Sequence, residues 1–138
     1  MHTTTTAALA LLLAAGCAST PRMQTSVTFE TVRPVLENTC LHCHGTNRLQ
    51  NMPALTDTLA IARLIGPGKL IVPGHPEQSR FLQVVTFTDT QAGAMPPTGH
   101  AISRPEVERL RTWITAGAPL PSGPPTPLTP RGEAPRSR

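Results

Sequence analysis

The residues best suited to chemistry are two cysteines and a histidine in the segment Cys40-Leu41-His42-Cys43-His44. Cys-x-x-Cys-His is an attachment signature for haem c. Two thiols at this spacing on a turn of helix can both reach the vinyl groups of a haem, and the next histidine then lies over the iron. We therefore expect Cys40 and Cys43 to hold one covalent haem c through thioethers, with His44 as the proximal iron ligand.

Two other chemistries use a Cys-x-x-Cys pair. A redox-active disulfide is expected in a βαβ context, which the sequence does not show. A zinc site could use Cys40, Cys43 and two histidines, but His75 and His100 lack the paired spacing typical of zinc ligands. A Cys/His zinc module therefore remains an alternative. His42 occupies a variable position of the motif and is expected to point away from a haem iron.

A second iron ligand is expected from the segment Ala94-Met95-Pro96-Pro97, just before the last predicted helix. A methionine thioether is a soft ligand that raises the reduction potential of haem iron, and the two prolines would stiffen the loop. We predict Met95 as the distal ligand. Met52 is a rival, although it follows His44 by only eight residues. His75 or His100 would give bis-histidine ligation, and an open sixth position is also possible.

The N-terminus has the features of an export signal. Residues 7–15 form an apolar run that is too short to span a bilayer, and the small residues that follow suit a cleavage site. The segment Ala14-Ala15-Gly16-Cys17 also resembles the lipobox of bacterial lipoproteins. We expect a signal over 1–16, a linker over 17–27, lipid attachment at Cys17 and a membrane-tethered periplasmic protein. Residues 1–6 lack Lys and Arg, and an ordinary export signal with an incidental Cys17 is the alternative.

The C-terminal segment 119–138 contains seven prolines, no aromatic residue and only two large aliphatic residues, Leu120 and Leu128. Such a segment buries little apolar surface against the entropy of ordering, so we expect a disordered tail. Residues 28–118 then form one domain. They carry eight Lys or Arg and seven Asp or Glu, without a basic cluster, which argues against binding to nucleic acid.

The apolar spacing of this domain predicts helices. They are expected over 29–36, over 55–64, from Pro76 onward and over 103–117, where Ser103 and Glu106 can form a capping box. No segment alternates apolar and polar residues as a strand does. The domain is therefore expected to be mainly helical. With three Phe and one Trp in so small a core, a large apolar cofactor would help to fill the interior.

Four stretches together resemble the planctomycete-type cytochrome c domain, a branch of the class I cytochromes. They are 32–45, 71–79, 94–99 and 106–118. The resemblance implies an all-α, cytochrome c-like fold of about four helices around one covalently bound haem. It assigns the thioethers to Cys40 and Cys43, and the axial ligands to His44 and Met95. His75 departs from the family, which often has Asp at that position.

The function implied by this resemblance is electron transfer, without catalysis, through transient contacts with redox partner proteins. The alternative from another class is a haem-based enzyme or sensor, in which an open sixth position binds peroxide, CO or NO. Two further residues have more than one interpretation. Arg48 could pair with a haem propionate or lie solvated on the surface, and Trp113 could pack on the haem edge or belong to the core.

Overall fold

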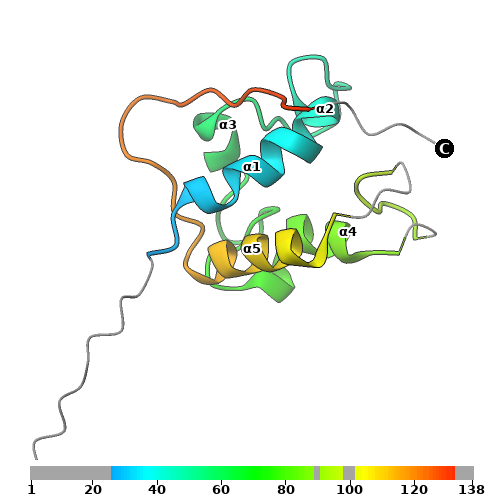
Figure 1. The fold of residues 1–138 in the computed structure, drawn as a ribbon. Helices are drawn as coiled ribbons and strands as arrows, with labels where there is room; N and C mark the ends of the chain where they lie inside the picture. Colours follow the sequence, from blue (N-terminus) through cyan, green and yellow to red (C-terminus); the bar gives the residue numbers. More distant parts are fainter. Residues whose placement is uncertain (1–25, 89–90, 98–101, 133–138) are drawn as a thin grey trace, which may run out of the picture.

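The computed structural model describes residues 26–88, 91–97 and 102–132, and in these ranges the chain forms helices without strands (Figure 1). The α-helices are α1 (Arg33–Val35), α2 (Leu41–His44), α3 (Thr58–Ala62), α4 (Arg80–Thr86) and α5 (Arg104–Thr115). Single helical turns cover Phe29–Thr31, Leu36–Cys40 and Pro76–Gln78. The all-α prediction is confirmed.

One almost continuous helical run leads from Phe29 to His44. It begins with a 3-10 turn, passes through α1, widens into a π-helical turn over Leu36–Cys40 and ends as α2. Pro34 lies in the first turn of α1, where its missing N–H removes no helical hydrogen bond. The run buries Phe29, Val35 and Leu36 on one side and presents the Cys-x-x-Cys-His motif at its end.

Helix α5 packs its apolar face against this run. The backbone N–H of Ser103 donates to Glu106 Oε2 at 2.8 Å, which forms the predicted capping box. Trp113 is buried, its ring meets that of Phe29 edge to face at 6.3 Å, and its indole N–H donates to the Pro119 carbonyl at 2.9 Å. Of the two interpretations for Trp113, the structure therefore favours the core.

The helix expected from Pro76 is divided into a 3-10 turn and α4. Ser79 separates them because its fully buried hydroxyl donates to the His75 carbonyl at 3.0 Å and accepts the Val72 N–H at 2.9 Å. This arrangement ties the preceding loop to the start of α4. The expected helix over 55–64 is also shorter: α3 begins after Asp57, whose Oδ1 accepts the Ala60 N–H at 2.7 Å.

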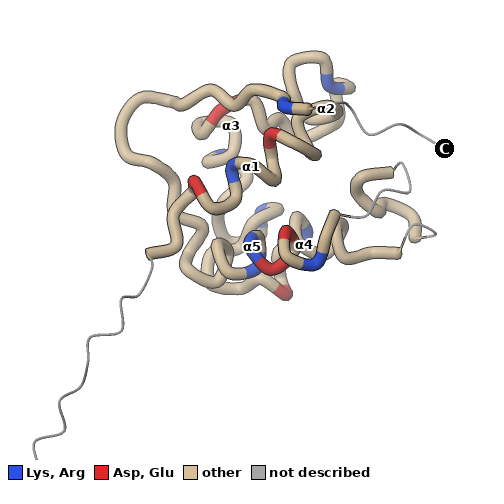
Figure 2. The backbone as a smooth tube through the Cα atoms, viewed as in Figure 1, with Lys and Arg blue, Asp and Glu red and all other residues tan. Residues whose placement is uncertain are grey.

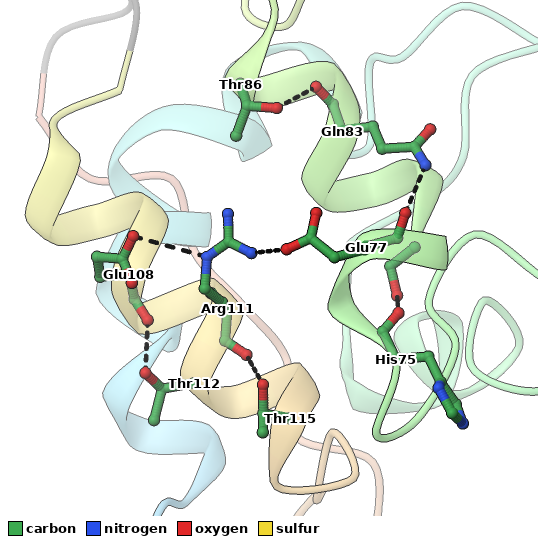
Figure 3. A network of polar contacts seen from close by, with 9 residues as sticks. His75, Glu77, Gln83, Thr86, Glu108, Arg111, Thr112 and Thr115 are labelled. Carbon is green, nitrogen blue, oxygen red and sulfur yellow. Dashed lines mark hydrogen bonds and ion pairs between the residues drawn. The ribbon is translucent and has the colours of Figure 1, made fainter.

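A polar network links the 3-10 turn to α5 (Figure 3). Arg111 pairs with Glu77 of the turn and lies 3.6 Å from Glu108 Oε1 on its own helix. Gln83 of α4 adds a hydrogen bond from its amide to the Glu77 carbonyl at 2.8 Å. Both glutamates are exposed, so these ion pairs contribute little to stability by themselves.

The expected disorder at the C-terminus does not extend to residues 119–132, which we call the C-terminal strap. The strap runs beside α3 toward α2 (Figure 1). Leu128 is 7% exposed and belongs to the main core. Its backbone N–H donates to the Thr56 carbonyl at 2.9 Å, and Thr126 and Thr58 exchange two hydrogen bonds of 2.9 and 3.0 Å. Proline-rich chain loses less entropy on ordering than flexible chain, so these few contacts can fix it.

The main anchor of the strap is Glu37, whose side chain is 2% exposed. Its carboxylate accepts hydrogen bonds from Arg33 Nε at 3.0 Å and from the Thr129 N–H at 3.3 Å, and it forms an ion pair with Arg131 Nε at 2.7 Å. The Glu37 carbonyl also accepts the Arg131 N–H at 2.9 Å. The residues that end the strap are thus held against the turn that directly precedes Cys40.

The predicted signal over 1–16, Cys17 and most of the predicted linker over 17–27 lie outside the described residues, as do residues 133–138 of the predicted tail. Among the helices that the structure describes, none is both long enough and apolar enough to cross a membrane.

Candidate haem-binding site

A largely apolar cavity opens between α2, α4 and the loop 91–97. Its volume is about 220 Å³, below the range of about 300–1,000 Å³ usual for ligand sites. The lining residues are Thr39, Cys40, Cys43, His44, Pro53, Leu55, Leu70, Arg80, Phe81, Val84, Val85, Met95, Pro96, Pro97 and Ile102. The cavity therefore brings together Cys40, Cys43, His44 and Met95, the four residues that the sequence predicts for haem attachment and ligation.

Cys40 and Cys43 line the cavity at the junction of the π-helical turn with α2, and no disulfide joins them. Burial raises the pKa of the Cys40 thiol to about 12, and the negative charges of Glu106 and Cys43 add to the effect. The Cys40 thiol contacts the Val35 carbonyl at 3.9 Å. A thiol that stays protonated is a poor nucleophile, so Cys40 is not suited to be the attacking thiol of a redox-active pair.

A hydrogen bond from one ring nitrogen, Nδ1, fixes the orientation of the His44 side chain. Its Nδ1 lies 2.9 Å from the Pro53 carbonyl oxygen, which can only accept a hydrogen bond. The Nδ1 nitrogen therefore carries the proton, and Nε2 retains the lone pair that binds a metal. Gly45 ends the helix with its backbone so close to α2 that a Cβ would lie 2.5 Å from the Leu41 carbonyl oxygen. The tight turn after His44 thus depends on glycine.

Met95 reaches the same cavity from the loop 91–97. Its backbone N–H donates to the Val84 carbonyl at 2.8 Å, which ties the loop to α4. The side chain is partly buried against the core, and Pro96 and Pro97 line the cavity beside it. A thioether from this loop and an imidazole from α2 therefore lie on one cavity, as two axial ligands of one iron require.

The rival ligands among the described residues lie elsewhere. Met52 does not line the cavity, and His75 lines a separate, more polar hollow with Lys69. His42 Nε2 is 3.2 Å from the Arg131 carbonyl oxygen of the C-terminal strap, in accord with the expectation that this side chain points away from an iron. His100 lies outside the described residues.

The arginine at the cavity is Arg80 and not Arg48, the candidate from the sequence. Arg48 does not line the cavity, and its Nε donates to the Met52 carbonyl at 3.2 Å. Arg80, the first residue of α4, does line it and stacks on the ring of Phe87. Nothing in the local sequence pattern marks Arg80, because its position depends on the break in the helix at Ser79.

A zinc site would require several ligands close together. In the ranges 26–88, 91–97 and 102–132, no group of three or more His, Cys, Asp or Glu side chains could hold a metal ion. A zinc site at Cys40 and Cys43 would therefore need a ligand from outside these ranges.

A helical fold that presents Cys-x-x-Cys-His on an apolar cavity is the architecture of a cytochrome c domain. Residues 40–99 match the family model of planctomycete cytochrome C, and the all-α structure around them agrees with a cytochrome c domain. The match covers less than half of the 138 residues, but it contains Cys40, Cys43, His44 and Met95. No curated protein and no solved structure matches the chain. A cytochrome c domain implies covalently bound haem c and haem-based electron transfer.

Proposed function

We propose that this protein is a monohaem c-type cytochrome that carries single electrons outside the cytoplasm, with iron ligated by His44 and Met95. The observation that carries the proposal is the convergence of two thiols, one imidazole and one thioether on a single apolar cavity. These are the donor types that a covalently attached, six-coordinate haem c requires.

Each residue has a distinct task in this proposal. Cys40 and Cys43 hold the group covalently, so that a small domain retains it. His44 binds iron through Nε2 because its Nδ1 proton is engaged by Pro53. Met95 would supply a second ligand from the same cavity, and a thioether ligand would raise the reduction potential. Haem c bound here supplies an iron that takes up and releases one electron.

The proposal is for a carrier and not for an enzyme. When His44 and Met95 both stay on the iron, no axial position is left for a substrate. Acidic and basic residues are intermingled along α5 (Figure 2), and such a mixed surface suits transient contacts with redox partner proteins. The proposed partners are defined only by their chemistry: they are proteins that donate or accept one electron.

Membrane tethering is proposed from the sequence. The segment Ala14-Ala15-Gly16-Cys17 supports acylation of Cys17 after signal cleavage, which would leave the domain in the periplasm on a short linker. Cells expressing the chain should place it in the membrane fraction, and a Cys17→Ser variant should move it to the soluble periplasmic fraction. Equal fractionation of both proteins would refute the lipid anchor.

The test of the proposed function is a redox titration of the mature protein, produced in a host that attaches haem c. We expect one reversible one-electron transition and a reduced protein whose spectrum does not change under CO. CO binding by the reduced wild type would instead indicate an open position and favour the enzyme or sensor alternative. A colourless protein containing zinc would refute the proposal.

A further inference from the structure

The cavity lining carries little charge. Of the lining residues that the structure describes, Arg80 is the one with a permanent charge, and no Asp or Glu is among them. Haem c bears two propionate side chains, which are anionic at neutral pH because carboxyl groups ionise near pH 4. A carboxylate at the edge of an apolar cavity is stabilised by a cation or by water.

Arg80 is held where it could supply that cation. Its guanidinium carbon lies 4.9 Å from the centroid of the Phe87 ring, at the other end of α4. A Cβ built on Gly93 would lie 3.5 Å from Arg80 Nη2, so the guanidinium lies near the loop that carries Met95. A stacked arginine loses less freedom when it binds a ligand, since its planar group is already oriented.

The hydrogen-bond donors of Arg80 are not engaged by the residues that the structure describes. The ion pairs there involve Arg33, Arg111 and Arg131, and no hydrogen bond from the Arg80 side chain is found. A guanidinium can bind a carboxylate through two parallel N–H···O contacts. Arg48, the candidate from the sequence, lies off the cavity and already donates to a backbone carbonyl.

We propose that Arg80 binds a haem propionate and so raises the reduction potential of the iron, an inference that rests on the proposed haem function. The cation offsets the negative charge of the propionate, which otherwise favours the oxidised, more positive iron. The position of Arg80, stacked on Phe87 and close to Gly93, also brings this propionate near the loop that provides Met95. Arg80 would thus be a positioning residue of the haem site.

The experiment compares the midpoint potentials of mature wild-type protein and single variants. Arg80→Gln should shift the equilibrium toward the oxidised form by about tenfold, which for one electron is about 59 mV. Arg80→Lys should restore part of the shift because it keeps the charge but loses the planar fork. Arg109→Gln is the matched control: it removes the same charge from an exposed site on α5 and should change the equilibrium less than twofold.

The outcomes separate this inference from the proposed function. A wild-type protein without covalent haem refutes both. A protein that holds haem, but in which Arg80→Gln stays within twofold of the wild type, refutes the role of Arg80 alone. A larger shift for Arg48→Gln than for Arg80→Gln also refutes it. A crystal structure of the mature protein should place an Arg80 nitrogen within about 3.2 Å of a propionate oxygen, and a propionate that contacts another residue instead would overturn the assignment.

Discussion

Replacing Glu37 with glutamine should destabilise the domain more than any other single charge removal on the first helical run. Glu37 is 1% exposed, and its carboxylate joins Arg33 on its own helix to Arg131 and Thr129 of the C-terminal strap. Glutamine keeps the shape of the side chain but removes the charge. It also directs an amide N–H₂ group toward at least one guanidinium.

The structure sets the size of the effect. A buried hydrogen bond to a charged group contributes about 1.5–3 kcal/mol, and breaking one partner of a buried ion pair costs about 3–5 kcal/mol. Arg131 is 66% exposed and Arg33 is 25% exposed, so water can replace part of what they lose. We therefore expect the free energy of unfolding to fall by about 2–3 kcal/mol, which corresponds to a decrease in Tm of about 10–20 °C for a domain of this size.

The pH dependence provides a second signature of the same contact. Burial by itself raises the pKa of Glu37, but the hydrogen bonds from Arg33 and Thr129 and the charges of Arg33 and Arg131 outweigh it, and the net pKa is lowered. A lowered pKa means that the stabilisation is complete above the ordinary glutamate value and is lost as the pH falls through the folded value. The difference between wild type and Glu37→Gln should be largest near pH 7 and shrink below about pH 4.

Urea unfolding of the mature protein, followed by circular dichroism, measures this difference. The matched control is Glu30→Gln, since Glu30 is 63% exposed and pairs with the same Arg33 at 3.6 Å. It should cost less than about 0.5 kcal/mol. In a chain truncated after Ala118, Glu37→Gln should cost far less than in the full chain, because the strap no longer covers the carboxylate. Equal costs in both chains, or no cost in the full chain, would refute the reasoning.

Three further substitutions test individual contacts. Met95→Ala should lower the reduction potential and let the reduced protein bind CO, whereas Met52→Ala should change neither; the reverse result in redox and CO-difference spectra would exchange their roles. Asp57→Ala removes the cap on the Ala60 N–H and should cost about 1 kcal/mol in urea unfolding, and an unchanged midpoint would mean that the cap is dispensable. Leu128→Ala should cost about 2 kcal/mol by the same assay, and a smaller effect than Leu49→Ala at an exposed site would show that the strap does not pack.

Local sequence signals predicted the elements whose causes are local. The capping box at Ser103 and Glu106 marked the start of α5, because both partners lie within one helical turn. Ser79 divided the helix expected from Pro76 through contacts with the preceding loop, which the apolar spacing does not record. The strap was missed for a related reason: its order depends on Glu37, which is distant in the sequence.

The residues of the candidate site also divide into those with a local sequence signal and those whose place depends on the fold. Cys40, Cys43 and His44 could be identified as a group because their spacing alone defines a chemistry. The second ligand stayed open between Met95, Met52 and the histidines, since only the fold determines which side chains share a cavity. Arg80 left no sequence signal, because its stacking on Phe87 and its proximity to Gly93 arise from how α4 and the methionine loop meet.

The most direct test of the central claim is whether haem stays with the polypeptide in acidified acetone. The protein would be produced with its signal in a host that matures haem c, precipitated with acidified acetone, and the pellet examined by visible spectroscopy. Our account predicts that haem remains in the wild-type pellet and is absent from a Cys40→Ala/Cys43→Ala variant. Haem that extracts from the wild type, or a colourless protein when a control cytochrome matures, would contradict covalent attachment at Cys40 and Cys43.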